Sequence, residues 1–254
     1  MNPEPILKQI LREAWEHQQS GKKFLAAFDL DSTLFDLTLR ISAIIDEFAA
    51  EPEHQTDFAE ELLLLKRVKI LSRDWGLDEP LRRVGLDPKS HFAKVLHQYW
   101  VERFFQSAYL IHDDPLKGAV QFAQELHQIG CHIMYLTGRD VPRMGTGTYD
   151  SLRQHHFPTE GELIHFRLKS DKSLDDALFK LDILKDARKD FARIWLFENE
   201  PVNLNLISRH CPEIGLVFID STHSGREQLQ LQLATIKHFE VDLSEFRNQP
   251  LRGK

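Results

Sequence analysis

Short apolar runs alternate with longer amphipathic stretches over most of the chain. The runs have the length of strands buried on both faces, and the stretches between them have helical periodicity. Strands that alternate with helices predict an α/β fold, a doubly wound parallel sheet covered by helices on both faces. Five runs predict strands: FLAAF (24–28), CHIMYL (131–136), ELIHFRL (162–168), ARIWLF (192–197) and GLVFI (215–219).

The amphipathic stretches predict helices with recognisable ends. The N-terminal helix should pack on the domain through one apolar face, formed by Leu7, Ile10, Leu11 and Ala14. Further helices are expected over 116–128, starting at Asp114 and Pro115 and closing at Gly130, over 148–156, over 175–189 with Ser173 and Asp176 as a capping box, over 202–210 and over 227–236.

The strand pattern disappears between residues 38 and 110, where only helices are predicted. They cover 39–50, 57–75 and 88–105, the last starting at Asp87 and Pro88. A chain of 254 residues is long for one compact domain, which agrees with a core that carries an insertion. We therefore expect an α/β core domain (1–37 and 111–254) and a helical cap domain (38–110) that packs on the core.

Composition narrows the classes of protein that remain. A hydrophobic fraction of 42% and a charged fraction of 28% exclude a mostly disordered chain. A net charge of −7 disfavours tight non-specific binding of nucleic acid. The N-terminal segment is interrupted by charges throughout, which is atypical of a signal peptide or a membrane span. Sparse cysteine usage, at Cys131 and Cys211 only, favours buried thiols in a reducing cytoplasm.

Two carboxylates, Asp29 and Asp31, follow the first predicted strand in the stretch DLDST. At about 4 Å two carboxylates repel by roughly 4 kcal/mol at an effective dielectric near 20, so the pair needs a cation or a chemical role. Thr137 and Glu198 also follow predicted strands. Ligands of parallel sheets bind at the carboxyl ends of the strands, and we expect these side chains to converge there.

A carboxylate at such a site can attack phosphorus and form an acyl phosphate, which divides one difficult hydrolysis into two easier steps. Asp29 is the candidate nucleophile. Asp31, two residues later, is placed to protonate the leaving alcohol and then to deprotonate the attacking water. In an extended chain, residues two apart lie on the same side.

The order of these features resembles that of the haloacid dehalogenase (HAD) superfamily. Four features carry the resemblance: DLDST, the strand ending in Thr137 and Gly138, a lysine that opens a later helix, and an acidic cluster after another strand. The resemblance extends over residues 22–36 and 112 to about 225. The resemblance implies a doubly wound sheet with a helical cap inserted between the first and second motifs. It also implies a magnesium-dependent phosphatase that works through a phosphoaspartate.

The resemblance assigns further roles. Thr137 is expected to hydrogen-bond the phosphoryl group, with Gly138 and Thr33 also at the phosphate. Arg139 either pairs with phosphate or braces its loop. Lys180 is the preferred third-motif lysine, because it falls in the first turns of a helix that follows a strand; Lys169 is the alternative.

The fourth motif departs from the family pattern, because glutamate and asparagine stand where aspartates are usual. The resemblance implies Mg²⁺ bound by Asp29, by the backbone carbonyl of Asp31 and by Glu198. Residues expected to hold metal-bound water are Asn199, Glu200 and Asn203. The structural alternative is that Glu200 and Pro201 simply begin a helix.

We therefore expect a cytoplasmic, Mg²⁺-dependent phosphomonoester hydrolase acting on a small phosphorylated substrate, with neither nucleic acid nor membrane as a partner. One alternative is a non-catalytic HAD-fold binding or regulatory protein. Another is a nucleotide or polynucleotide-end phosphatase, because RLKSDKSLDDALFK loosely resembles the third motif of polynucleotide phosphatases. Basic residues of the cap either meet an anionic substrate or are merely solvated: Lys66, Arg67, Lys69, Arg73, Arg82 and Arg83.

Overall fold

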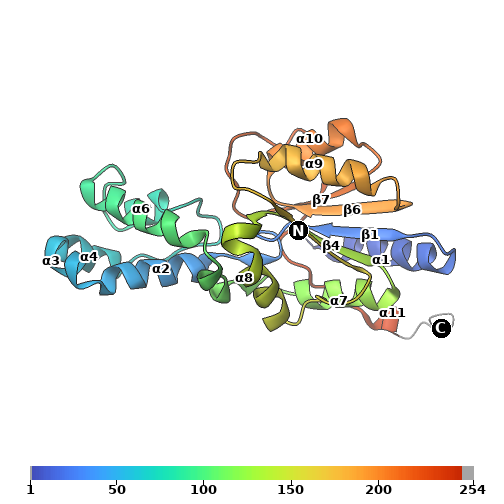
Figure 1. The fold of residues 1–254 in the computed structure, drawn as a ribbon, viewed down its shortest axis with the longest axis horizontal. Coiled ribbons are helices and arrows are strands. Elements are labelled where there is room, and N and C mark those ends of the chain that lie inside the picture. Colours follow the sequence, from blue (N-terminus) through green and yellow to red (C-terminus); the bar gives the residue numbers. More distant parts are fainter. Residues whose placement is uncertain (1, 248–254) are drawn as a thin grey trace.

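A six-stranded parallel sheet forms the centre of the computed structural model, which describes residues 2–247 (Figure 1). The strand order is β5-β4-β1-β6-β7-β8, and every neighbouring pair is parallel. All five predicted strands are present. The strands are β1 (Phe24–Phe28), β4 (His132–Asp140), β5 (Ile164–Lys169), β6 (Arg193–Glu198), β7 (Gly215–Ile219) and β8 (Ala234–Ile236).

The sixth strand corrects one prediction. Residues 227–236 were expected to form a helix, but 227–233 are irregular and β8 pairs with β7 at the sheet edge. The leucines of this stretch alternate with glutamines, and Leu229, Leu231 and Leu233 all pack against one core cluster. A period of two is the strand period, so the extended backbone serves these leucines better than a helix would.

The strand order places a topological switch beside β1. The chain runs outward from β1 through β4 to β5, then crosses back to β6 on the other side of β1. In open parallel sheets, the crevice at such a switch is the usual ligand site. The carboxyl ends of β1 and β6 therefore define the place to look for chemistry.

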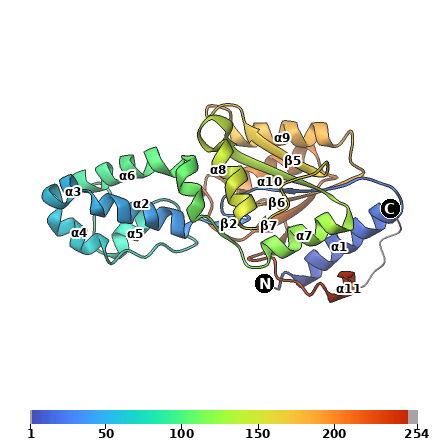
Figure 2. The same ribbon diagram turned by 60° about the horizontal axis from the view of Figure 1, so that its bottom comes forward.

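Helices cover both faces of the sheet, as Figures 1 and 2 show. On β1, Phe24, Ala26 and Phe28 face one hydrophobic cluster, while Leu25 and Ala27 face the other. The first cluster lies under α1 (Glu4–Gln19), α7 (Ala119–Ile129) and the end of α8 (Val141–Gln154); the second lies under α9 (Asp176–Ala187) and α10 (Pro201–His210). A short helix, α11 (Ser244–Arg247), follows β8.

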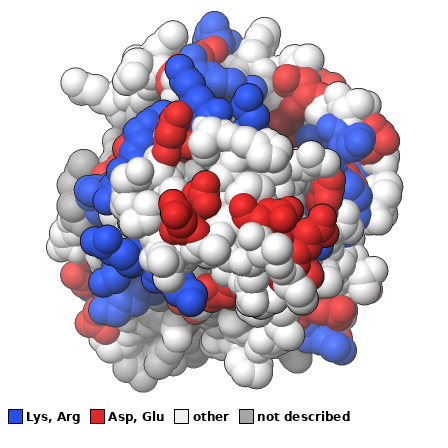
Figure 3. Space-filling view, turned by 90° about the vertical axis from the view of Figure 1, so that its left-hand side faces the viewer, with Lys and Arg blue, Asp and Glu red and all other residues white. Residues whose placement is uncertain are grey.

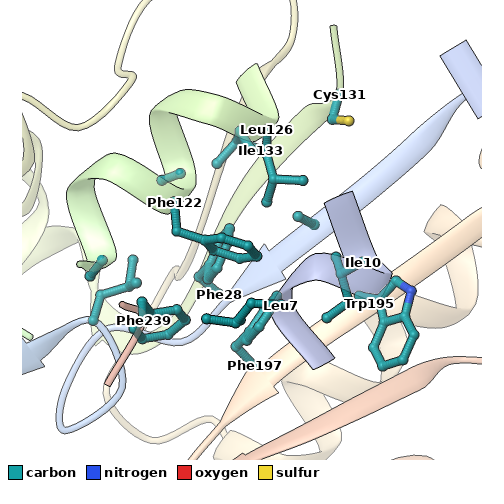
Figure 4. Close-up of a cluster of buried hydrophobic side chains, with 14 of the residues drawn as sticks. Leu7, Ile10, Phe28, Phe122, Leu126, Cys131, Ile133, Trp195, Phe197 and Phe239 are labelled. Carbon is teal, nitrogen blue, oxygen red and sulfur yellow. The ribbon is translucent and has the colours of Figure 1, made fainter. Parts of the chain in front are cut away.

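Aromatic rings dominate the first cluster (Figure 4). The rings of Phe28 on β1 and Phe197 on β6 are stacked with centroids 4.6 Å apart, and Phe122 of α7 meets Phe197 edge-on at 5.6 Å. Phe239 lies 5.6 Å from Phe197. These contacts tie the two strands that carry the site to the helix layer, and each buried ring contributes packing beyond its area.

The helix boundaries follow the predictions with identifiable exceptions. The predicted face of α1 is buried, and α7 ends at Gly130 in the left-handed conformation. However, α7 begins after Gly118, because Asp114–Pro115 forms β3, which pairs antiparallel with β2 (Phe35–Asp36). The segment that leaves the core and the segment that returns to it thus lie side by side as β2 and β3.

Two other helix starts differ from prediction. Helix α8 begins at Val141 rather than 148, because the Asp140 side chain accepts a hydrogen bond from the Arg143 N–H at 3.0 Å. Helix α9 is capped by Asp175, whose carboxylate accepts from the Leu178 N–H at 2.9 Å. The expected Ser173 and Asp176 capping box is therefore wrong, although the helix itself is where it was predicted.

The insertion forms a helical body beyond one end of the core (Figures 1 and 2). It has its own hydrophobic cluster, centred on Phe48, Phe92 and Leu96. Its elements are α2 (Thr38–Ala50), α3 (Pro52–Asp57), α4 (Ala59–Leu65), α5 (Asp78–Arg83), α6 (His91–Phe104) and the 3₁₀ helix η1 (Ser107–His112).

One helix predicted in the insertion is wrong in its second half. Helix α4 ends at Leu65, and residues 66–77 form an irregular loop. In this loop the Asp74 carboxylate accepts a hydrogen bond from the Leu71 N–H at 2.7 Å, and Gly76 adopts φ of 67°. A side chain that bonds to nearby backbone competes with the helix, which explains the difference.

Both cysteines, Cys131 and Cys211, are buried and free, as their sparse usage predicted. The cytoplasmic location inferred from them stays a prediction. None of the helices in the described part of the chain is long and apolar enough to span a lipid bilayer.

Gly118 allows a test of how closely the start of α7 packs against the backbone of Phe239. Its φ is 80°, and a Cβ built on it would lie 2.5 Å from the backbone carbon of Phe239. We expect Gly118→Ala to lower the free energy of unfolding by more than about 2 kcal/mol, because left-handed backbone strain and a clash with main chain add. Urea unfolding measures the difference.

Gly225→Ala is the matched control, because Gly225 has φ of 68° but nothing lies within 4 Å of the position that a Cβ would take there. It should cost only the strain, about 1 kcal/mol. Equal losses in the two variants would show that the contact with Phe239 does not matter.

Candidate active site

A tight turn follows β1 and sets the direction of its acidic side chains. The Leu30 carbonyl accepts hydrogen bonds from the N–H groups of Thr33, Leu34 and Phe35 at 2.9–3.1 Å. Ser32 takes a left-handed φ of 61°, which closes the turn. Within it, the Asp29 N–H donates to the Phe197 carbonyl at 3.0 Å, so Asp29 is still held against β6.

Lys180 lies among three carboxylates at the strand ends. Its Nζ donates to Asp29 Oδ1 at 2.7 Å and to Glu198 Oε2 at 2.8 Å, and lies 3.4 Å from Asp176 Oδ2. The lysine and the carboxylates of Asp29 and Glu198 are almost completely buried. The structure thus brings the predicted nucleophile, lysine and fourth-motif acid together at the crevice beside β1.

Burial and mutual charge shift the pKa values in this cluster. Burial raises the pKa of Asp29 well above its ordinary value; Lys180 opposes that rise, and Glu198 and Asp176 add to it. Burial alone would lower the pKa of Lys180, but the carboxylates of Asp176, Asp29 and Glu198 raise it well above its ordinary value. The lysine therefore stays protonated at neutral pH, while ionised Asp29 needs more positive charge than Lys180 alone supplies.

The Glu198 carboxylate has four hydrogen-bond donors. Its Oε1 accepts from the N–H groups of Asn199 and Glu200, both at 2.9 Å. Its Oε2 accepts from Lys180 at 2.8 Å and from Asn203 Nδ2 at 3.0 Å. A carboxylate offers about four lone-pair sites, so Glu198 already has a full set of partners.

Asp176 is a site residue that sequence analysis treated only as a helix cap. It stands at the first position of α9, one turn before Lys180. Burial alone would raise its pKa, but Lys180 and Lys169 lower it below the ordinary value. The Asp-x-x-x-Lys spacing carried the signal, because residues four apart share a helix face.

Gly138 owes its identity to Asp176 in this arrangement. A Cβ on Gly138 would lie 2.3 Å from Asp176 Oδ1, so only glycine leaves room for the carboxylate. Both Asp176 Oδ1 and Asn203 Oδ1 are buried acceptors without a hydrogen-bond partner in the structure. The expected phosphate contact of the Gly138 backbone stays a prediction.

Asp31 lies in a separate ion-pair network. Arg139 Nη2 donates to Asp31 Oδ1 at 2.6 Å and to Asp113 Oδ2 at 2.7 Å. Arg40 Nη2 donates to Asp31 Oδ1 at 2.8 Å, and Arg40 Nε donates to Asp113 Oδ1 at 2.6 Å. Arg40 comes from α2 of the insertion, and Asp113 precedes β3, so this network connects both chain crossings to the site.

Sequence analysis missed Arg40 and Asp113, which carry no motif. Burial alone would raise the pKa of Asp31, but Arg139 and Arg40 outweigh it and hold that pKa well below its ordinary value. Burial alone would lower the pKa of Arg139, but Asp31 and Asp113 raise it. Asp31 is therefore ionised at neutral pH.

The hydroxyl and amide side chains expected at the site are also close to it. Thr33 Oγ1 donates to Asn199 Oδ1 at 3.2 Å, and Asn199 Nδ2 donates to the Thr222 carbonyl at 2.6 Å. Thr137 Oγ1 accepts from the Arg139 N–H at 3.3 Å. Glu200 directly precedes α10, and its carboxylate accepts hydrogen bonds from the Ser224 N–H and Oγ at 2.7 and 2.8 Å.

Lys169 does not contact Asp29. Its Nζ donates to the Leu174 carbonyl at 3.0 Å, although the residue lines the same cavity as Lys180. Lys180 is therefore the lysine that touches the predicted nucleophile.

A cavity of about 880 Å³ opens between the core and the insertion. Asp29, Asp31, Thr137 and Lys180 line its core side. A cavity of this size accommodates a small-molecule ligand. Catalytic candidates from three separate segments, the turn after β1, β4 and α9, thus line one cavity.

The negative charge and the oxygen atoms of the site suit a hard divalent cation. Three carboxylates surround one ammonium group, and the acceptors are all oxygen, which Mg²⁺ prefers. Among residues 2–247, however, no three His, Cys, Asp or Glu side chains already converge as a metal-binding group. Asp29, with a carboxylate that lines the cavity, is the best-placed ligand, whereas Glu198 must exchange one of its four partners to become one.

No protein-family model matches the chain, and no curated protein sequence matches it. Among solved structures, one described as a candidate phosphatase from Clostridium difficile has a TM-score of 0.51 at 13% identity, covering 85% of this chain and 94% of that one. The chain has a HAD-like fold. The HAD resemblance is thus confirmed as fold, and at this identity the likeness shows nothing further.

Two other structures align over similar lengths. A haloacid dehalogenase-like family hydrolase from Streptococcus pneumoniae has a TM-score of 0.49 at 14% identity, covering 85% of this chain and 94% of that one. Protein Tyrosine Kinase A from Mycobacterium tuberculosis has a TM-score of 0.49 at 17% identity, covering 84% and 93%. The activity of the present HAD-like chain must be argued from its own residues.

Removing the ammonium group of Lys180 should destabilise the folded protein, because three carboxylates lie around that group. We expect Lys180→Met to lower the free energy of unfolding at pH 7 by about 3–5 kcal/mol, because it leaves buried charges without their partner. Lys185→Met, at an exposed position of the same helix, should change it by less than about 0.5 kcal/mol. Chemical denaturation measures the free energy of unfolding of both variants. An equally small loss in Lys180→Met and Lys185→Met would contradict the ion pairs described for Lys180.

Arg40→Met should make stability less sensitive to acid. Asp31 has a lowered pKa in the folded state, so its contribution is present above its unfolded pKa and is lost as pH falls through the folded value. We expect the variant to be about 3–5 kcal/mol less stable than the wild type at pH 7. The gap should narrow below about pH 4, the ordinary pKa of aspartate. A gap that is constant from pH 7 to pH 3, measured by urea unfolding, would contradict this.

Proposed function

We propose that this protein is a hydrolase of phosphomonoesters that acts through a phosphoaspartate on Asp29. The observation that carries the proposal is the Asp29 carboxylate, at the carboxyl end of β1, lining the cavity with Lys180 Nζ 2.7 Å away. The HAD-like fold of the chain is consistent with this reaction. Substrate choice belongs to the helical insertion, which acts as a cap over the cavity.

The reaction has two displacements. An Asp29 oxygen attacks phosphorus, the P–O bond to the alcohol breaks, and the electron pair leaves with the alkoxide, which takes up a proton. Water then attacks the phosphoaspartate, loses a proton and releases inorganic phosphate with Asp29 regenerated. Lys180 offsets the negative charge that gathers on Asp29 and the phosphoryl oxygens.

Asp31 is the candidate acid/base residue, and its surroundings favour one of its two tasks. An ionised carboxylate can accept the proton of the attacking water. To protonate the leaving group, Asp31 must first be loosened from Arg139 and Arg40 and take up a proton from solvent. The guanidinium of Arg139 also contacts Asp113 and Thr148, which supports bracing of the loop over direct phosphate binding.

Magnesium dependence is part of the proposal. Asp29 and the backbone carbonyl of Asp31 would hold Mg²⁺, with Glu198 joining after exchange of a hydrogen bond. Asn199, Glu200 and Asn203 lie near enough in sequence to Glu198 to position metal-bound water. Bound Mg²⁺ would supply charge neutralisation for phosphate and favour the ionised nucleophile. Thr33 and Thr137 would position the phosphoryl oxygens beside it.

A second candidate function follows from the complete set of partners around Glu198. A site whose acidic groups are already paired with donors can bind a phosphate-containing ligand without turning it over. That observation favours the non-catalytic binding or regulatory alternative. The polynucleotide-end alternative is supported less, because the cap side of the cavity lacks lysine and arginine among the described residues.

Phosphate release from an aryl phosphate in the presence of Mg²⁺ tests the proposal. We expect Asp29→Asn to lower kcat/KM by more than about a thousandfold, because it removes the attacking group. Asp114→Asn, at an exposed position of β3, is the control and should keep the wild-type rate. Chelation of Mg²⁺ should also abolish turnover. Equal rates in wild type and Asp29→Asn would refute the proposal, and binding of phosphate without turnover would favour the alternative.

A further inference from the structure

The two sides of the cavity differ in chemistry. Among the described residues, every lysine and arginine that lines it belongs to the core, and the cap side has none. The core contributes Arg139, Arg143, Lys169, Lys172, Lys180 and Arg226. Positive charge is therefore gathered where the proposed phosphate site lies, and a second anionic group would find no cation on the cap side.

Aromatic side chains of α6 line the cap side. His97, Trp100 and Phe104 are spaced by three and four residues, which places them on one face of the helix, and Phe105 follows directly. Neighbouring rings are in contact: the centroids of Trp100 and Phe104 are 4.8 Å apart, and those of Phe104 and Phe105 are 5.0 Å apart. We call these four residues the aromatic row.

Trp75 faces the same cavity from the irregular loop 66–77. Trp75 is 59% exposed, so much of its indole surface is open to a ligand in the cavity. The loop is fixed, because Arg83 Nη1 and Nη2 donate to the two carboxylate oxygens of Asp74 at 2.7 and 2.5 Å. The bidentate ion pair thus fixes the loop backbone directly before Trp75.

Two basic residues of the cap, Arg82 and Arg83 of α5, form ion pairs within the cap. Arg82 pairs with Asp78 and Glu79, and Arg83 with Asp74. On the end of the molecule formed by the cap, basic and acidic side chains are interspersed (Figure 3). This arrangement favours solvation and local pairing over attraction of an anionic substrate.

We propose that the ligand of this site is a phosphomonoester of an uncharged aromatic group, with its phosphate at Lys180 and its ring between Trp75 and the aromatic row. The inference rests on the proposed function for the phosphate end only. Stacking on indole and phenyl rings favours a flat apolar group. A bisphosphate would meet no lysine or arginine on the cap side among the described residues, where Asp74 and Asp78 also line the cavity.

Binding of phosphonates by the wild-type protein with Mg²⁺ tests this without turnover. We expect calorimetry to show that 1-naphthylmethylphosphonate binds at least about tenfold more tightly than methylphosphonate, because only the former buries an aromatic ring. In Trp75→Ala this preference should fall severalfold, while methylphosphonate affinity stays unchanged. Leu63→Ala, which removes a cap side chain that is 65% exposed and does not line the cavity, should keep the wild-type preference.

Kinetics separate the two proposals. If 1-naphthyl phosphate and glycerol phosphate are both hydrolysed, the ratio of kcat/KM in Trp75→Ala to that in wild type should fall for the naphthyl ester only. Hydrolysis with equal ratios, or equal affinity for the two phosphonates, would overturn the aromatic-ligand inference and leave the phosphatase proposal standing. Tighter binding of the naphthyl phosphonate without hydrolysis of either ester would support the aromatic-ligand inference and refute the phosphatase proposal.

Discussion

The ammonium group of Lys180 is the interaction on which the site depends. It lies within hydrogen-bond distance of Asp29 and Glu198, which come from neighbouring strands, and near Asp176 on its own helix. Burying several carboxyl groups beside one another is costly without a cation among them. The same contacts join the ends of β1 and β6 to the start of α9, so the charge balance also fixes the geometry.

A second group of charges ties the site to the cap. Arg40 and Asp113 stand on either side of the insertion, and both reach the network around Asp31 and Arg139. Asp31 is therefore influenced by the position of the cap, because one of its two arginines belongs to α2. The contacts of Arg40 with Asp31 and Asp113 thus join the insertion to the core at the edge of the site.

The insertion and the core line the cavity with different kinds of side chain. The core supplies the cations and hydroxyl groups suited to phosphate, whereas α6 and the loop 66–77 supply aromatic surface. Phe104 belongs to both systems, since the guanidinium of Arg40 lies 4.7 Å from its ring centre. Ligand contacts at the aromatic row thus lie one side chain away from the ion pairs around Asp31.

Hydrophobic pattern alone determined the five main strands, the helical insertion and the positions of Asp29 and Glu198 at strand ends, because period and burial are local properties of the chain. Thr137 was expected directly after its strand but lies within β4, which continues to Asp140. The place of Lys180 in the first turns of a predicted helix also favoured it over Lys169. Tertiary structure alone decided that Lys180 rather than Lys169 touches Asp29, that Glu198 has four donors, and that Arg40 and Asp113 hold Asp31. These facts depend on distances between residues far apart in sequence, and no local periodicity encodes such distances.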